Sequence, residues 1–154
     1  MSKPEFVYVI LIEAPIEKVW EALTKGEHTR HFWAGRSVQS DWKLGSRVEF
    51  RMDTDNSLQH SGTVLEVDPP KRLVMTFYVD SAKEPEPASR VTYELSEFHG
   101  ATRLTLIHDD FIAGGKTYDG VSQGWPAILS SMKTYLERGS PMAMTRKWRE
   151  ARGE

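Results

Sequence analysis

The chain contains no cysteine, and this absence excludes disulfide bonds, thiolate nucleophiles and thiolate metal ligands. It also lacks a long apolar run, because the longest one, Phe6 to Ile12, is far too short to span a bilayer. Residues 1–5 have neither the charged region nor the cleavage site of an export signal. From these absences we expect a cytoplasmic protein without a membrane span.

An excess of either charge is missing as well. The 154 residues include 20 basic and 22 acidic side chains, for a formal net charge of −2, and the two signs are interspersed. The five tryptophans could stack on nucleic-acid bases, but that mode of binding also requires a basic groove. We therefore expect no nucleic-acid partner, and the length fits one domain with a single hydrophobic core.

The first part of the chain predicts a strand followed by two helices. Residues 6–12 are rich in β-branched and aromatic side chains, which favours a strand. Gly26 can end a following helix, and residues 27–33 predict a second, short one. The first helix opens with a proline and has apolar residues at helical spacing, namely Ile16, Val19, Trp20 and Leu23.

The middle of the chain predicts antiparallel strands. Apolar and charged residues alternate in residues 46–52, as they do in a strand with one face in water. Residues 80–89, with two prolines among charges, predict a loop. Similar alternation predicts further strands at residues 61–67, 72–79, 91–95 and 104–108.

The last apolar pattern predicts a long helix. Its apolar residues, from Val121 to Leu136, lie on one stripe, and Gly139 can end it. Pro126 leaves two alternatives open: the regular helix begins close to Trp125, or a longer helix is kinked at the proline.

Four motifs stand in one order along the chain: Ala14-Pro15-Ile16-Glu17-Lys18-Val19-Trp20, the segment from Gly62 to Leu73, the segment from Gly100 to His108, and Gly124-Trp125 with Leu129. Together they resemble the SRPBCC superfamily, which is also called START-like. Within it, they are most similar to the branch named for the activator of the ninety-kilodalton heat-shock protein ATPase. The resemblance covers residues 6–139.

This resemblance implies an α+β helix-grip fold, in which a curved antiparallel sheet of six or seven strands wraps around a long C-terminal helix. Two short helices follow the first strand. We expect a single helix-grip domain at residues 1–139 and a C-terminal basic tail at residues 140–154, whose structure stays open. The superfamily typically binds hydrophobic or amphipathic ligands in a cavity between sheet and helix, and some branches include polyketide cyclases and hydrolases.

Binding of a small hydrophobic or amphipathic ligand is therefore the function we expect. A cyclase- or hydrolase-like enzyme using the same cavity, and a co-chaperone or other protein-interaction module, remain as alternatives. A chaperone partner is not expected, because the eukaryotic co-chaperone makes its major chaperone contacts through a separate N-terminal domain, for which 154 residues leave no room. A homodimer stays open.

Alternation along the strands and spacing along the last helix predict the residues of the cavity wall. The same alternation is what a filled core needs, so an open pocket and a packed core both remain. The candidates are apolar or aromatic except for one histidine, and they are Trp33, Phe50, Met52, Met75, Phe77, Tyr93, Leu106, His108, Trp125 and Leu129.

His108 is the candidate for catalysis. It continues an apolar strand face and precedes Asp109 and Asp110, so it could act as a general base beside a carboxylate. It or Tyr93 could instead orient a ligand by hydrogen bonding, and a plainer alternative is a strand-end histidine satisfied by backbone or water. The sequence has no strict catalytic motif, and we expect binding rather than catalysis.

No cofactor and no metal are expected. His28 and His31 stand close enough on the predicted short helix to share a metal, but a zinc site usually needs a third protein ligand, and none stands out. Residues 114–117, Gly-Gly-Lys-Thr, lack the upstream glycine of a phosphate-binding loop.

Overall fold

A computed structural model describes residues 4–151, which form seven strands and four helices. Neighbouring strands are antiparallel, in the order β1-β7-β6-β5-β4-β3-β2. None of these four helices combines the length and hydropathy needed to cross a membrane. In chain order the elements are β1 (Phe6–Ile12), α1 (Ile16–Thr24), α2 (Gly26–Phe32), β2 (Arg36–Gln39), β3 (Arg47–Met52), β4 (Leu58–Asp68), β5 (Arg72–Val79), β6 (Ser89–Phe98), β7 (Ala101–Asp109), α3 (Thr117–Arg138) and α4 (Met144–Ala151).

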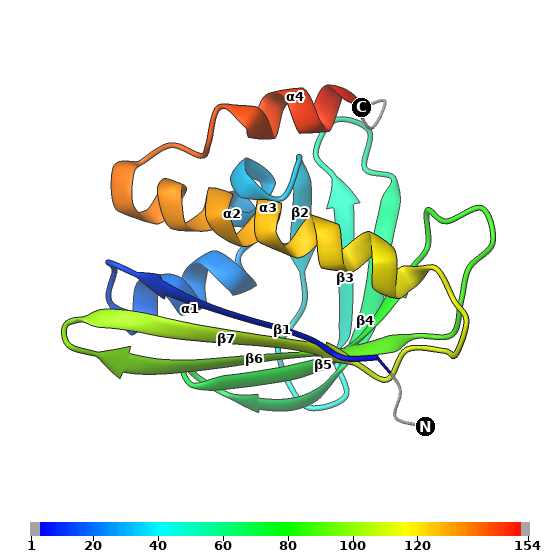
Figure 1. The fold of residues 1–154 in the computed structure, drawn as a ribbon, viewed down its shortest axis with the longest axis horizontal. Helices are drawn as coiled ribbons and strands as arrows, with labels where there is room; N and C mark the ends of the chain where they lie inside the picture. Colours follow the sequence, from blue (N-terminus) through cyan, green and yellow to red (C-terminus); the bar gives the residue numbers. More distant parts are fainter. Residues whose placement is uncertain (1–3, 152–154) are drawn as a thin grey trace.

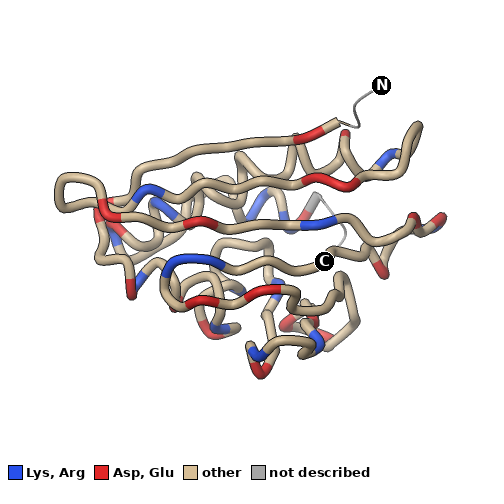
Figure 2. Tube along the Cα trace, turned by 90° about the horizontal axis from the view of Figure 1, so that it is seen from below, with Lys and Arg blue, Asp and Glu red and all other residues tan. Residues whose placement is uncertain are grey.

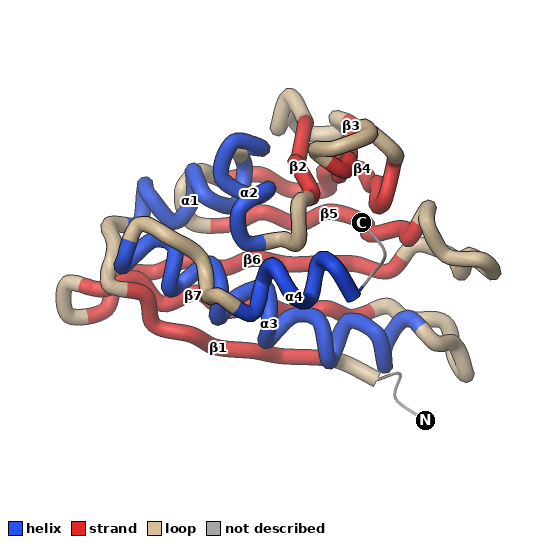
Figure 3. Tube along the Cα trace, turned by 90° about the horizontal axis from the view of Figure 1, so that it is seen from above, coloured by secondary structure: helices blue, strands red, loops and turns tan. Residues whose placement is uncertain are grey.

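The sheet curves around the long helix α3, and the short helices α1 and α2 cover one end of the concave face (Figure 1). Seen from above, α4 runs beside α3 over the same face of the sheet, and β2, β3 and β4 lie at the edge opposite to β1 (Figure 3). Seven antiparallel strands curled around a C-terminal helix confirm the helix-grip fold.

One element differs from the sequence prediction, and another decides between two alternatives that the sequence left open. Strand β2 was not predicted, because its four residues include a single apolar side chain; it exists because it pairs with β3, from Arg36 opposite Met52 to Gln39 opposite Glu49. Helix α3 begins at Thr117 and continues through Pro126, so the alternative in which it starts near Trp125 is wrong. At β2, pairing with the neighbouring strand therefore overrides the local pattern.

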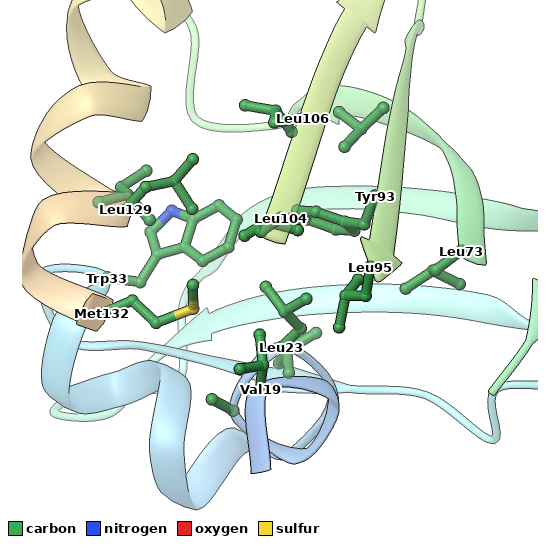
Figure 4. Close-up of a cluster of buried hydrophobic side chains, with 14 of the residues drawn as sticks. Val19, Leu23, Trp33, Leu73, Tyr93, Leu95, Leu104, Leu106, Leu129 and Met132 are labelled. Atoms are coloured by element: carbon green, nitrogen blue, oxygen red, sulfur yellow. The ribbon is translucent and has the colours of Figure 1, made fainter. Parts of the chain in front are cut away.

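The core lies between the concave face and the helices. In α1, Ile16, Val19 and Leu23 are at most 7% exposed, which confirms the predicted apolar stripe. Figure 4 shows Leu129 and Met132 of α3 on one side of the Trp33 ring, and sheet residues such as Leu104 and Tyr93 on the other. Burial of this apolar surface is the main stabilising contribution to the fold.

The outer face of the sheet carries both signs of charge in short alternation (Figure 2). Cross-strand pairs join Arg90 of β6 to Asp109 of β7 at 2.8 Å, and Arg72 of β5 to Glu94 of β6. Exposed pairs of this kind contribute little to stability. Their effect is to keep the outer face hydrophilic.

The region predicted as a basic tail contains helix α4, which contacts the rest of the protein. The hydroxyls of Thr145 and Ser131 lie 2.6 Å apart, and both residues are buried. Arg149 pairs with Asp53 in the turn after β3, and Trp148 packs against the core. Residues 152–154 of the tail lie outside the described residues, and the division of the chain at residue 139 stays a prediction.

Candidate functional site

A cavity of about 640 Å³ lies between the N-terminal half of α3 and the strands β4 and β5. The loops before β6 and before α3 border its mouth, and in Figure 1 they lie beside the start of α3. Its apolar wall consists of Trp33, Phe77, Val79, Val121, Trp125, Ile128 and Trp148. Its charged and polar residues are Arg36, His60, Lys83, Glu84, Glu86, Lys116 and Thr117.

Two glycines of α3 contribute to the space. Gly120 and Gly124 are four residues apart, line the cavity, and have no atom within 4 Å of the position that a Cβ would occupy. Glycine inside a helix costs about 0.5–1 kcal/mol relative to alanine. Gly120 is exposed and Gly124 is half-buried, and both lie on the helix face that lines the cavity, so the absence of side chains there leaves space open.

The loop at the mouth is fastened to the first turn of α3. Glu86 accepts hydrogen bonds from the backbone N–H groups of Lys116 at 2.6 Å and Thr117 at 3.1 Å, and from the Thr117 hydroxyl at 2.7 Å. These bonds lower the pKa of the Glu86 carboxyl and keep it ionised. The carboxylate thus satisfies donors that a helix N-terminus leaves unpaired.

Trp125 is held as a cavity wall by a chain of hydrogen bonds that starts at its indole. The Trp125 Nε1–H donates to His108 Nδ1 at 2.9 Å, so this nitrogen is an acceptor and the neutral ring carries its proton on Nε2. His108 Nε2–H then donates to Ser89 Oγ at 2.7 Å, and the Ser89 hydroxyl donates to the Phe77 carbonyl at 3.2 Å. Each polar atom in this buried chain has a partner.

These contacts assign His108 a structural position rather than a catalytic one. Burial lowers the pKa of His108 to about 3, so the ring is neutral at physiological pH. Asp109 projects to the opposite face of β7 and pairs with Arg90. With both ring nitrogens engaged by Trp125 and Ser89, His108 lacks the free lone pair that a general base needs.

The structure brings three of the ten predicted wall residues to the cavity, namely Trp33, Phe77 and Trp125. The ring centroids of Trp33 and Trp125 are 5.1 Å apart, in an edge-on arrangement. The other seven are packed in the interior at 2% exposure or less and do not line the cavity: Phe50, Met52, Met75, Tyr93, Leu106, His108 and Leu129. The interior therefore contains both a packed core and, next to it, an open cavity.

Sequence reasoning missed the polar residues of the cavity. Arg36 is 2% exposed, and its guanidinium donates to the Ala34 carbonyl at 3.4 Å and to Gln59 Oε1 at 3.3 Å. His60 is 8% exposed and stacks on Phe77 with ring centroids 4.9 Å apart. Arg36 lies on the unpredicted strand β2, and His60 precedes the predicted start of its strand, so alternation offered no signal for either.

A second hollow, of about 410 Å³, lies between α2 and α4 and is bordered by Arg30, His31 and Arg149 among others. The His31 ring stacks on Tyr135 at 5.4 Å, and His28 Nδ1 lies 2.7 Å from the Tyr135 hydroxyl. Burial, together with the positive charge of Arg30, lowers the pKa of His31. Within residues 4–151, no group of three or more His, Cys, Asp or Glu side chains is placed to hold a metal ion.

Comparison with known proteins agrees with this fold. Residues 13–137 match the family described as Activator of Hsp90 ATPase homolog 1-like protein, whereas a search of curated proteins found no match.

Similar solved structures include MLL2253 from Mesorhizobium loti, at 25% identity and a TM-score of 0.75, covering 88% of this chain and 98% of that one. CalU16 from Micromonospora echinospora has 24% identity and a TM-score of 0.71, covering 97% and 84%. The Aha1 dimer from Colwellia psychrerythraea has 19% identity and a TM-score of 0.71, covering 88% and 98%. With a family match over most of its length and the helix-grip fold of these neighbours, the chain belongs to the Activator of Hsp90 ATPase homolog 1-like protein family, within the SRPBCC superfamily.

Proposed function

We propose that the protein binds a small hydrophobic or amphipathic ligand in the cavity beneath the N-terminal half of α3. The observation that carries this proposal is the hollow of about 640 Å³ with aromatic walls and two glycines facing it. Ligand pockets in proteins usually have volumes of about 300–1,000 Å³ and mostly apolar linings with a few polar groups. The cavity has both properties.

A neutral fluorescent probe, N-phenyl-1-naphthylamine, tests this proposal. We expect binding with a stoichiometry of about one, because a single apolar cavity drives it. We also expect the probe to perturb tryptophan emission, because Trp33, Trp125 and Trp148 border the cavity.

Gly124→Leu should weaken binding by occupying the hollow, whereas Gln123→Leu is the matched control, because Gln123 is exposed on the same helix. Absence of binding to the wild-type protein, or equal binding by both variants, would refute the cavity as a ligand site. Conversion of an ester or polyketide-like substrate would instead favour the cyclase- or hydrolase-like alternative. That enzyme would have to act without His108 as its base.

A homodimer is our second proposal, and edge strand β1 is the surface that favours it. Val7 and Val9 are 50% and 55% exposed on this edge. The Leu11 carbonyl accepts a hydrogen bond from Lys133 at 2.7 Å, so it points away from β7. The backbone N–H and C=O groups of every second residue in a strand point to the same side, so those of both valines also point away from β7. A second copy could pair with them, and the similar Aha1 structure is that of a dimer.

Sedimentation of the wild-type protein and of Val9→Lys tests this pairing. We expect a dimer for the wild type and a monomer for the variant, since a charge on an edge strand opposes pairing. Leu44→Lys is the control, because Leu44 is 75% exposed away from β1. A monomeric wild-type protein would refute the dimer.

A further inference from the structure

The second hollow, between α2 and α4, has an excess of positive charge. Among residues 4–151, its lining includes three arginines, Arg30, Arg146 and Arg149, and a single carboxylate, that of Asp53. Three positive charges against one negative charge leave an excess of two. His31 also lines the hollow and adds no charge at physiological pH, because burial and the charge of Arg30 lower its pKa.

This hollow is separate from the cavity beneath α3. Within the part of the chain that the structure describes, the two spaces have no lining residue in common. The smaller one is bordered by α2, the turn after β3 and the start of α4, and the larger one by α3 and the sheet. A ligand of the smaller hollow would therefore be independent of the hydrophobic ligand proposed above.

Gly35 joins the parts of the smaller hollow. Its N–H donates to the Arg30 carbonyl at 3.1 Å, and its own carbonyl accepts a hydrogen bond from the Asp53 N–H at 2.8 Å. A Cβ at this position would lie 2.5 Å from Arg149 Cζ, so glycine lets the guanidinium approach the backbone this closely. Its φ of 84° also favours glycine. The backbone at Gly35 thus brings α2, the turn after β3 and α4 around one space.

Arg149 is fixed in position and keeps donors for a further partner. Its Nη1 lies 3.4 Å from Asp53 Oδ2, and its Nη2 donates to Asp53 Oδ1. These bonds use two of the five N–H donors of a guanidinium. The guanidinium groups of Arg30 and Arg146 make no hydrogen bond or ion pair with any residue between 4 and 151. Three arginines from two helices therefore offer donors to the same hollow.

Another part of the lining is apolar. Pro141, Met142 and Ala143 border the hollow where the chain enters α4. Its volume of about 410 Å³ lies within the range of about 300–1,000 Å³ that is usual for small-molecule sites. The hollow thus has room for an organic group beside an anion.

We propose that this hollow binds a phosphate group, as the free ion or as the monoester of a small molecule. A phosphate monoester carries a charge of about −1.5 to −2 at neutral pH, which balances the excess of two positive charges, whereas a carboxylate would balance only one. Arginine binds phosphate oxygens through paired N–H groups, and such charge-assisted bonds are stronger than bonds between neutral groups. The apolar part of the lining favours the monoester over the free ion.

Titrations with phenyl phosphate, inorganic phosphate and benzoate, followed by nuclear magnetic resonance at constant ionic strength, test this proposal. We expect both phosphate compounds to give saturable shifts of the Gly35 and Thr145 backbone signals. Phenyl phosphate should bind about tenfold more tightly than benzoate, because it adds charge-assisted hydrogen bonds. Tighter binding of phenyl phosphate than of inorganic phosphate identifies the monoester as the ligand, and the reverse or equal binding identifies the free ion. Absence of saturable shifts with both phosphate compounds, or equal binding of benzoate and phenyl phosphate, would overturn the site.

Arg146→Met and the matched control Lys147→Met locate the phosphate. Both residues are exposed on α4, so neither substitution should unfold the protein, but Arg146 lines the hollow and Lys147 does not. Arg146→Met should weaken binding of phenyl phosphate about tenfold, and Arg30→Met should do the same from α2. Lys147→Met should change it less than about twofold. Equal weakening by Arg146→Met and Lys147→Met would show a general attraction to a basic helix and would overturn the site.

His31 provides a readout that needs no substitution. The charges that act on its ring are those of Arg30, His28 and Asp53, and Tyr135 of α3 stacks on it. The two arginines of α4 border the same hollow. A phosphate bound among these groups should raise the pKa of His31, because a nearby negative charge favours the protonated ring. An unchanged pKa at saturating phenyl phosphate would place the anion outside the hollow and refute the proposal.

Discussion

The two halves of α3 place different side chains against the sheet. In the C-terminal half, Leu129 and Met132 are fully buried and complete the core. In the N-terminal half, Gly120 and Gly124 present no side chain, and the cavity lies beneath them. One helix therefore fills one end of the interior and leaves the other end hollow, and the size of its inward residues makes the difference.

Trp125 marks the boundary between the two halves. Its ring lines the cavity on one side, and its indole N–H is bonded to His108 in the sheet on the other. Substitutions at Trp125 and on either side of it therefore test where the packed core ends.

The largest effect is expected for Trp125→Ala. Truncation joins the hollow to the core and leaves His108 Nδ1 without its donor, so we expect a loss of about 3–5 kcal/mol in the free energy of unfolding. Urea denaturation measures it. A loss below about 1 kcal/mol would mean that the ring contributes little to packing and that the boundary is elsewhere.

The contrast between the halves predicts different costs for the same kind of truncation. Leu129→Ala should cost about 2–5 kcal/mol, because Leu129 is fully buried. Val121→Ala, on a wall that already faces empty space, should cost less than about 1 kcal/mol. Equal losses in urea denaturation would contradict a hollow N-terminal half.

Stability should depend on pH through His108. Burial lowers its pKa from the ordinary 6.5 to about 3, so between these values the unfolded chain binds a proton that the folded protein does not. The free energy of unfolding should therefore include the full contribution of His108 above pH 6.5. Acidification from there toward pH 4 should lower it by about 1.4 kcal/mol per pH unit.

Comparison with His108→Asn isolates this contribution, since the amide oxygen can still accept the Trp125 N–H bond while the titrating group is gone. The difference between the two proteins removes the contributions of other titratable groups. The same pH dependence in both would show that His108 is accessible to protons in the folded state.

Removal of residues 140–154 should have a smaller effect. The truncation deletes the Thr145 contact to Ser131, the Arg149 pair with Asp53 and the packing of Trp148, which together contribute about 1–3 kcal/mol. Thermal and urea denaturation measure the loss. An unchanged free energy of unfolding would support a domain that ends at residue 139.

Local pattern predicted the elements that carry their own periodicity. The stripe of α1, the alternation of β5 and the apolar positions of α3 lie in consecutive residues, and each is found in the structure. The family resemblance predicted how these elements pack. Together they account for the fold except β2 and α4: β2 is short and exists through its pairing with β3, and α4 lies in the tail, whose structure the sequence left open.

The candidate site was less predictable, because its contacts join residues far apart in sequence. Alternation correctly placed His108 on the inner face, but its partners Ser89 and Trp125 are 19 and 17 residues away in sequence. The pairing of β6 with β7, in which Val91 lies opposite His108, brings Ser89 close to it. Whether the cavity is filled or open depends on side chains from five elements at once, namely β2, β4, β5, α3 and α4. The place of Arg36 in the cavity lining was hidden for the same reason.

The smallest effect has the opposite sign and tests the hollow directly. Gly120→Ala and Gly124→Ala should each raise the free energy of unfolding by about 0.5–1 kcal/mol, because alanine favours the helix and no atom lies within 4 Å of either new Cβ. Gly62→Ala is the control: its Cβ would lie 1.9 Å from the Thr76 carbonyl oxygen, so it should destabilise. Both alanine substitutions should also weaken binding of the naphthylamine probe slightly, because they narrow the cavity. A loss of stability on Gly124→Ala would show that the space beneath α3 is occupied, and the contrast between its halves would then disappear.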